Sequence, residues 1–212
     1  IKSVAIIRGE QLLPLNPTLK DVTQWGMTLE PVSRADYKLK ETSPRIQSII
    51  DSYEKPLLIP EGGCGELGVL GAAKMLEEVD QSKFDYVVCA CGTATTLSGL
   101  IYASEKHIKL IGVPVLKAKN WMDQEVMDYL KVLHCDKHNW QLLYDYHFGG
   151  YAKMPENLLQ FVADIKTDYG LALDPVYTGK AFFALLDQIK NGQIPEGSKV
   201  LFVHTGGLQG AR

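Results

Sequence analysis

The chain has 212 residues, of which 46% are hydrophobic and 22% are charged. This length can bury a full core, and the composition is typical of a globular protein rather than of a disordered or fibrous one. The 22 basic and 25 acidic residues give a net charge of −3, which argues against binding nucleic acid through charge. The most apolar stretch, residues 86–103, is interrupted by glycine, threonine and serine and does not predict a membrane span.

The expected elements alternate between strand and helix. In chain order they are strand Ser3–Ile7, a helix from Pro17 that stops at Gly26, strand Thr28–Val32, a helix from Pro44 to about Tyr53, strand Leu57–Ile59, helix Glu66–Val79, strand Phe84–Cys91, a helix ending near Ser104, strand Lys109–Val115, helix Met122–Val132, strand Gln141–Tyr144, a helix from Pro155 to about Tyr169, helix Thr178–Lys190 and strand Lys199–His204. Apolar strands that alternate with helices predict an α/β fold, with mainly parallel sheets and helices on both faces.

The polar helical region Ser33–Tyr53 separates the first two strands from the rest. It predicts two lobes, residues 1–55 and 56–212. The chain opens on an apolar strand at Ile1 and closes on a glycine turn that follows a strand, so we expect that an N-terminal portion is missing.

Cysteine and histidine usage carries less information. The four cysteines, Cys64, Cys89, Cys91 and Cys135, are too few for a disulfide scaffold and form no CxxC pair, so we expect a reducing compartment and a cytoplasmic location. The segment His134–His138 has two histidines that one helical face can present, but no second Cys or His pair accompanies it. A solvated helix end is favoured there over a metal site.

Two glycine-containing loops are candidates for ligand binding. Gly92, Thr93, Ala94, Thr95 and Thr96 lie between the most apolar strand and a helix, where backbone amides and hydroxyls can bind a phosphate. A plain turn with capping threonines is the alternative. Residues 63–68 match GxGxxG, but the next strand does not end on the acid that a dinucleotide ribose requires. A tight turn with close helix packing is favoured for that segment.

Two later segments lie at the ends of elements. Leu173–Lys180 precedes a helix and contains Thr178, which is the expected N-cap. His204–Gly207 follows the last strand, at the carboxyl edge where open α/β sheets bind ligands.

Together these segments resemble the D-cysteine desulfhydrase and 1-aminocyclopropane-1-carboxylate deaminase family. The resemblance rests on Ile59–Gly63, Gly92–Thr96, Ile111–Val113, Asp174–Lys180 and His204–Gly207, which occur in the family's order and approximate spacing. It implies a pyridoxal-phosphate enzyme with the tryptophan synthase β-like fold (fold type II), a small amino-acid substrate and a homodimer. It also implies that residues 1–55 are the remainder of the small lobe and residues 56–212 the large cofactor-binding lobe.

The resemblance assigns roles to particular residues. The Gly92–Thr96 loop matches the cofactor phosphate loop, and Thr205 and Gly206 match the segment beside the pyridine ring. Thr178 falls where the family places a partner for the pyridine nitrogen. The two residues that match active-site tyrosines are Tyr151 and Tyr177. The family's Schiff-base lysine lies in an Asn-Lys-x-Arg-Lys run, which this sequence does not contain; Lys180 belongs to another motif.

Two positions favour one activity of the family over the other. The resembling deaminases have glutamate where Thr178 stands and leucine where Thr205 stands, and a neutral threonine cannot hold a proton on the pyridine nitrogen. We therefore expect β-elimination of hydrogen sulfide from D-cysteine, giving pyruvate and ammonia. Deamination of 1-aminocyclopropane-1-carboxylate is one alternative. A non-catalytic α/β protein that binds a phosphate ligand is another.

Overall fold

The structure of the chain is a computed structural model that describes residues 1–10, 13–119 and 121–211. The chain folds as two compact units, residues 1–59 and 60–212. Within the described residues, every helix is too short or too polar to cross a membrane.

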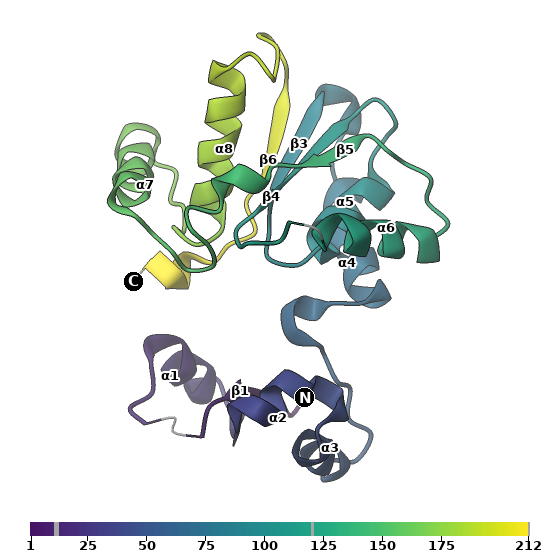
Figure 1. The fold of residues 1–212 in the computed structure, drawn as a ribbon, viewed down its shortest axis with the longest axis vertical. Coiled ribbons are helices and arrows are strands. Elements are labelled where there is room, and N and C mark those ends of the chain that lie inside the picture. The colour runs from purple at the N-terminus through teal and green to yellow at the C-terminus, as the bar shows by residue number, and fades with distance from the viewer. Residues whose placement is uncertain (11–12, 120, 212) are drawn as a thin grey trace. The chain divides into compact units, whose positions relative to one another are not determined.

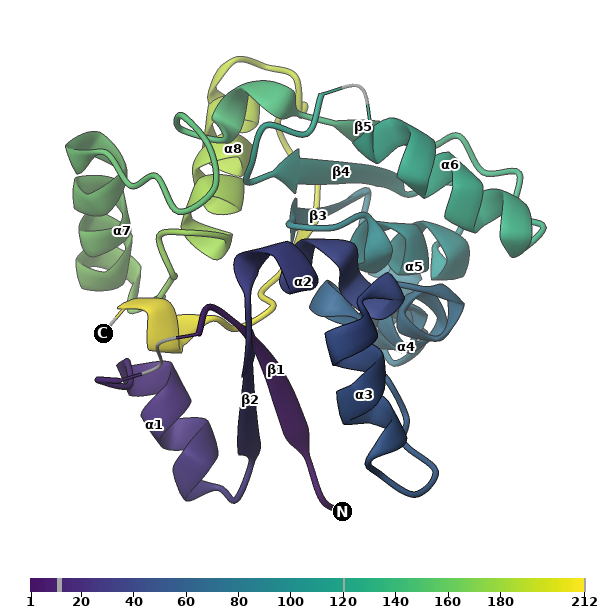
Figure 2. The ribbon, with the colours of Figure 1, turned by 60° about the horizontal axis from the view of Figure 1, so that its bottom comes forward.

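The first unit contains a two-stranded parallel sheet with helices around it (Figure 2). Its elements are β1 (Val4–Arg8), α1 (Pro17–Gln24), β2 (Thr28–Val32), α2 (Arg34–Leu39) and α3 (Pro44–Asp51). Each helix begins with a side-chain cap that accepts a backbone N–H, provided by Asn16, Ser33 and Ser43. Val32, Ile46 and Ile49 form its small core.

The helical region Ser33–Tyr53 contains α2 and α3, because Lys40 ends α2 with a positive φ of 52°, and α3 begins at Pro44 as expected. One expectation for this part of the chain was wrong, because the segment Leu57–Ile59 is not a strand. The prolines at 56 and 60 lack the N–H that a sheet ladder requires, and Leu57 and Ile59 are 80% and 72% exposed.

The second unit is built on a four-stranded parallel sheet of order β5-β4-β3-β6 (Figure 1). Its strands are β3 (Tyr86–Cys91), β4 (Lys109–Pro114), β5 (Trp140–Leu142) and β6 (Val200–Val203). Its helices are α4 (Glu66–Glu77), α5 (Thr95–Ala103), α6 (Met122–Val132), α7 (Glu156–Tyr169) and α8 (Thr178–Lys190). The predicted parallel α/β architecture with helices on both faces is confirmed.

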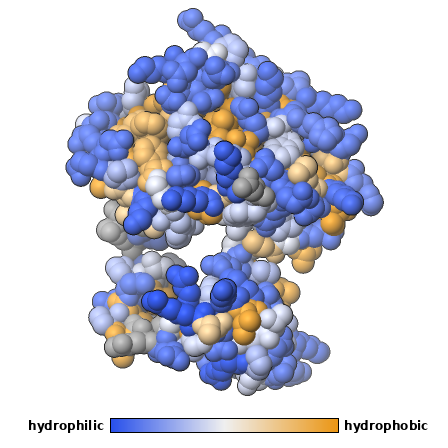
Figure 3. Space-filling view, viewed as in Figure 1, coloured by the Kyte–Doolittle hydropathy of each residue, from blue (hydrophilic) through white to orange (hydrophobic). Residues whose placement is uncertain are grey.

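Alternation along β3 divides the core between the two faces of the sheet. Val87, Cys89 and Cys91 pack with α4, α5 and α6 on one face. Tyr86, Val88 and Ala90 pack with α8 on the other. The sheet is therefore the middle of three layers, and its strand ends fix where the loops emerge. On the outside, polar residues cover most of the surface seen in Figure 3, with smaller apolar areas between them.

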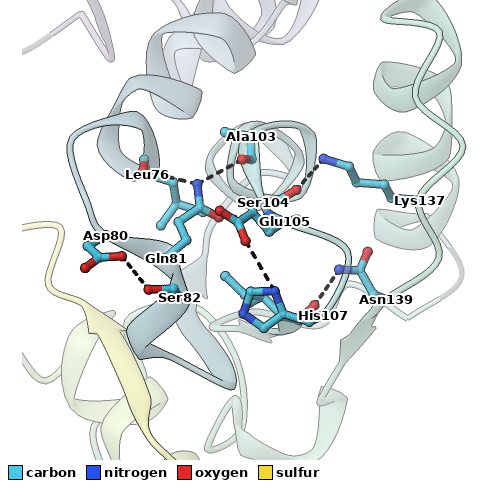
Figure 4. A network of polar contacts seen from close by, with 11 residues as sticks. Leu76, Asp80, Gln81, Ser82, Ala103, Ser104, Glu105, His107, Lys137 and Asn139 are labelled. Carbon is cyan, nitrogen blue, oxygen red and sulfur yellow. Dashed lines mark hydrogen bonds and ion pairs between the residues drawn. The ribbon is translucent and has the colours of Figure 1, made fainter.

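A network of polar side chains closes the ends of α4 and α5 (Figure 4). Lys137 donates to the carbonyls of Ile101, Tyr102 and Ser104 at 3.2, 2.6 and 2.5 Å. Gln81 donates to the carbonyls of Leu76 and Ala103. These groups satisfy carbonyls that a helix leaves without internal partners. The network stabilises the C-terminal ends of α4 and α5.

Candidate active site

The loops after β3, β5 and β6 leave the sheet at its carboxyl edge, because the four strands are parallel. Tyr177 and Thr178 lie instead where the segment between α7 and α8 joins α8. The chain passes from β3 to β4 on one side, whereas β6 joins β3 on the other. This reversal is a topological switch point, the usual position of a ligand site in an open α/β sheet. The loop after β3 and the turn after β6 flank it.

The loop Gly92–Thr96 leads from β3 directly into α5. Ala94 and Thr95 are buried, while Gly92, Thr93 and Thr96 are partly accessible. In the described residues no side chain caps α5, and the Thr93 hydroxyl instead donates to Thr95 Oγ1 at 3.2 Å. The alternative of a turn with capping threonines therefore does not describe this loop. The first amides of α5 remain suited to an anion.

The GxGxxG segment has a packing explanation. A Cβ on Gly68 would lie 1.9 Å from the Gly63 carbonyl oxygen and 3.0 Å from Thr95 Cγ2. Gly65 has a φ of +119° and donates its N–H to Tyr129 Oη at 3.1 Å. The glycines thus permit a tight turn that packs against the Gly92–Thr96 loop.

Tyr177 and Tyr151 meet beside this loop. The Tyr177 hydroxyl donates to the Tyr151 hydroxyl at 3.2 Å, and the two rings pack edge to face with centroids 6.0 Å apart. A Cβ on Gly92 would lie 2.9 Å from Tyr177 Cε1. The structure therefore brings together three of the predicted site residues, which come from three separate loops.

The two tyrosines differ in environment. Tyr151 is 58% exposed, whereas Tyr177 is partly buried at the start of α8. Burial raises the pKa of Tyr177, and the neighbouring Tyr151, Asp174 and Glu61 raise it further. Tyr177 therefore keeps its proton at neutral pH and can act as a hydrogen-bond donor.

Asp174, which the sequence reasoning did not single out, organises the start of α8. Its Oδ1 accepts the backbone N–H groups of Val176 and Tyr177, and its Oδ2 accepts the N–H of Thr178. Thr178 is thus not the N-cap, because Tyr177 occupies that position and no side chain caps it within the described residues. Asp174 instead holds the turn that leads into α8, and an aspartate that bonds to the backbone two residues on was the available signal for such a turn.

The surroundings of Thr178 argue against its expected contact with the pyridine nitrogen. Thr178 is 0% exposed. Its hydroxyl donates to Asp174 Oδ2 at 2.7 Å and accepts the Asp174 N–H at 2.9 Å. No ligand can reach this hydroxyl in the observed conformation. A threonine at this position is instead explained by its two hydrogen bonds with Asp174 at the start of α8.

Thr205 and Gly206 lie in the turn after β6. Thr205 is exposed, and the Gly206 N–H donates to His204 Nδ1 at 3.1 Å. A Cβ on Gly207 would lie 3.1 Å from Asp174 Oδ2, so this turn packs against the start of α8. The structure thus joins the turn to the Tyr177 region through Asp174, while the Thr205 hydroxyl makes no hydrogen bond within the described residues.

The segment His134–His138 follows α6 as irregular chain, with both histidines exposed. It is not helical, so the two imidazoles do not share a helical face.

Comparisons with known proteins agree on one family. The family described as "Pyridoxal-phosphate dependent enzyme" matches residues 16–206. A Pyrococcus horikoshii protein named "Putative 1-aminocyclopropane-1-carboxylate deaminase" is 30% identical over 99% of this chain and 67% of its own length. An Arabidopsis thaliana protein named "Bifunctional D-cysteine desulfhydrase/1-aminocyclopropane-1-carboxylate deaminase, mitochondrial" is 31% identical over 87% of this chain and 51% of its own length.

Solved structures support the same assignment. A crystal structure described as an ACC deaminase homologue has a TM-score of 0.80 and 29% identity, over 100% of this chain and 67% of that chain. Serine racemase from Dictyostelium discoideum has a TM-score of 0.62 at 12% identity, covering 98% of this chain and 69% of that one, which supports the type II fold alone. The chain belongs to the D-cysteine desulfhydrase and 1-aminocyclopropane-1-carboxylate deaminase family of pyridoxal-phosphate dependent enzymes.

Proposed function

We propose that the full-length protein eliminates hydrogen sulfide from D-cysteine. The overall reaction consumes one water and gives pyruvate, ammonia and hydrogen sulfide. The observation that supports this proposal most is the Tyr177–Tyr151 pair beside Gly92, at the switch point of the sheet. Two phenol groups there can bind and protonate a departing group next to an anion-binding loop.

The residues present fit the phosphate of pyridoxal phosphate. The amides of the Gly92–Thr96 loop begin α5 without a side-chain cap, and the hydroxyls of Thr93 and Thr96 are partly accessible. We assign this loop to the phosphate and the Thr205-Gly206 turn to the edge of the ring. When bound, the cofactor supplies an electron sink for the pair released from the substrate Cα–H bond.

The tyrosines are assigned to proton handling at the substrate. Because its pKa is raised, Tyr177 keeps a proton on Oη and is suited to donate it to the departing sulfur. Exposed Tyr151 accepts from Tyr177 and can replace a proton that Tyr177 gives up.

The deaminase alternative requires a deeper electron sink, because the bond that breaks in the cyclopropane ring is carbon–carbon. Neither position that differs from the resembling deaminases can hold a proton on the cofactor ring here, because Thr178 is buried and bonded to Asp174 and Thr205 carries a neutral hydroxyl. The carboxylate of Asp174 is 1% exposed and already accepts three backbone N–H groups. These features favour desulfhydration.

The test uses full-length protein supplied with pyridoxal phosphate. Pyruvate from D-cysteine and 2-oxobutyrate from 1-aminocyclopropane-1-carboxylate are measured at matched substrate concentrations. We expect faster pyruvate formation. Faster 2-oxobutyrate formation would establish the deaminase alternative, and cofactor binding with neither product would establish the non-catalytic one.

Two further assignments concern location and assembly. We propose a cytoplasmic location because all four cysteines are free thiols, as is usual in a reducing compartment. We propose a homodimer from the family resemblance, and light scattering of the purified protein measures it.

A further inference from the structure

A lysine that the mechanism does not use lies entirely inside the second unit. Lys180 is 0% exposed and belongs to the first turn of α8. Its Nζ donates to the carbonyl oxygens of Gly150, His147 and Val115 at 2.9, 3.0 and 3.2 Å. An ammonium has three donors, so all of them are used. Because burial of a charge is costly, such an arrangement calls for an explanation.

The three carbonyls come from two segments next to the site. Val115 directly follows β4, whereas His147 and Gly150 belong to the irregular turn at residues 147–152, which contains Tyr151. The ammonium thus ties this turn both to the end of the sheet and to the start of α8, which carries Tyr177. Burial lowers the pKa of Lys180, and the carboxylate of Asp174 opposes this shift in part.

The turn before Tyr151 has little regular structure of its own. Phe148, Gly149, Gly150 and Ala152 all have positive φ, at 53°, 92°, 132° and 54°. Left-handed conformations at Phe148 and Ala152 are unfavourable for side chains and persist where surrounding contacts impose them. The contacts of Lys180 with His147 and Gly150 lie on either side of Phe148 and Gly149, and Ala152 follows two residues later.

We propose that Lys180 is a positioning residue that holds the 147–150 turn so that the Tyr151 hydroxyl stays within hydrogen-bonding distance of Tyr177. This inference rests on the proposed function in one respect, namely that the two tyrosines act together in turnover. Lys180 itself touches no substrate, because its side chain is buried and its three donors are occupied.

The first test measures the turn itself and needs no turnover. Lys180→Met keeps much of the side-chain length but removes all three donors, and Lys190→Met is the matched control because Lys190 is exposed at the other end of α8. In the holoenzyme we expect faster hydrogen exchange at the amides of residues 149–152 in Lys180→Met, with unchanged exchange in β3 and α5. Lys190→Met should exchange like the wild type. Unchanged exchange at residues 149–152 in Lys180→Met would overturn the proposal.

The second test is a double-mutant cycle in turnover. Lys180→Met and Tyr151→Phe should each lower kcat, by about 100-fold for a misplaced group, and the double variant should lose no more than the more damaging single one. Losses that multiply would overturn the proposal, because they would show that Lys180 acts independently of Tyr151. A merely structural lysine would give such independent losses.

Two controls keep the outcomes separate. If Lys180→Met fails to fold, Lys180→Gln is used, because the glutamine amide retains two donors. If neither variant folds, the proposal is overturned, because Lys180 then holds the whole unit together. If the wild type turns over neither D-cysteine nor 1-aminocyclopropane-1-carboxylate, the proposed function fails, and hydrogen exchange alone decides the role of Lys180.

Discussion

The hydroxyls of Tyr177 and Tyr151 lie 3.2 Å apart, although 26 residues separate them in the chain. The backbone of Tyr177 is held by Asp174, whose carboxylate accepts the Tyr177 N–H at 2.7 Å. Tyr151 follows Gly150, whose carbonyl accepts from Lys180. Two buried charged residues of one motif, Asp174 and Lys180, therefore place the two phenols.

Removing either phenol should reduce turnover with little effect on folding. Tyr151→Phe and Tyr177→Phe each remove a hydroxyl from this pair, and loss of a group that moves a proton lowers kcat by about 10²–10⁴-fold. Steady-state kinetics with D-cysteine measure the effect. Tyr169→Phe is the control, because Tyr169 is 75% exposed at the end of α7. Wild-type kcat in both site variants would exclude a role for the pair in catalysis.

A methyl group at Gly92 should disturb both the phosphate loop and Tyr177. The new Cβ of Gly92→Ala would lie 2.9 Å from Tyr177 Cε1, so the loop or the ring must move. We expect weaker cofactor binding and a kcat lowered by about 100-fold, as for a group displaced by about 1 Å. Cofactor titration and kinetics measure these two effects.

Gly71→Ala is the matched control for that experiment. Gly71 is an exposed glycine within α4, and a Cβ there would meet nothing within 4 Å. Alanine should raise the free energy of unfolding by about 0.5–1 kcal/mol and leave turnover unchanged. A Gly92→Ala protein that behaves like Gly71→Ala would show that the loop does not contact Tyr177 as described.

Much of this architecture could be predicted from the sequence. The bounds of β2, α6 and α8 agree with the expected ones, because apolar periodicity and helix-start residues are local signals. The strand expected at Leu57–Ile59 failed because three apolar residues without a partner strand do not form a sheet, and the flanking prolines weaken pairing.

The site could be predicted only in part. The position of the glycine–threonine loop at the start of α5 could be predicted from its composition, and its role in binding an anion stays a prediction. The functions of Asp174 and Lys180 could not be predicted, because they depend on carbonyls and amides brought together by the fold. The contact of Thr178 with the pyridine nitrogen was predicted for the same reason, because the motif does not reveal that the Thr178 hydroxyl is bonded to Asp174.

Thr178 should therefore matter for stability more than for the choice of reaction. Thr178→Val removes the hydroxyl donor to Asp174 Oδ2 and leaves the buried Asp174 N–H without its acceptor, at a cost of about 1–3 kcal/mol in the free energy of unfolding. Thr178→Ser retains the hydroxyl and should behave like the wild type. Thermal unfolding measures both variants.

A Thr178→Val protein with wild-type stability but an altered kcat would contradict this account. It would support the predicted contact between Thr178 and the cofactor instead. Thr178→Glu, which copies the resembling deaminases, places a larger charged group in a fully buried position and should destabilise α8 rather than switch the reaction.

In the first unit, Asp36 should make stability depend on pH. Its carboxylate accepts from the hydroxyls of Ser33 and Ser43 at 2.5 and 2.7 Å. These hydrogen bonds hold the pKa of Asp36 below its usual 3.8, and the bond from Ser33 has the larger effect. A carboxyl with a lowered pKa in the folded state contributes stability that is fully present above pH 3.8 and is lost as the pH falls through the folded-state pKa.

Hydrogen exchange at Ile46 and Ile49 measures this effect in wild type and Asp36→Asn. The wild type should be better protected near neutral pH, and the difference should shrink below pH 3.8. A difference that stays constant with pH would show that the carboxylate charge does not contribute.

The position of the cofactor phosphate tests the account most directly. A crystal structure of the full-length protein with pyridoxal phosphate locates it. We expect the phosphate oxygens within about 2.7–3.2 Å of amides or hydroxyls of Gly92–Thr96, with Tyr177 and Tyr151 beside the ring. A phosphate bound elsewhere, for example at the glycines of residues 63–68, or a ring placed away from both tyrosines, would contradict the assigned site.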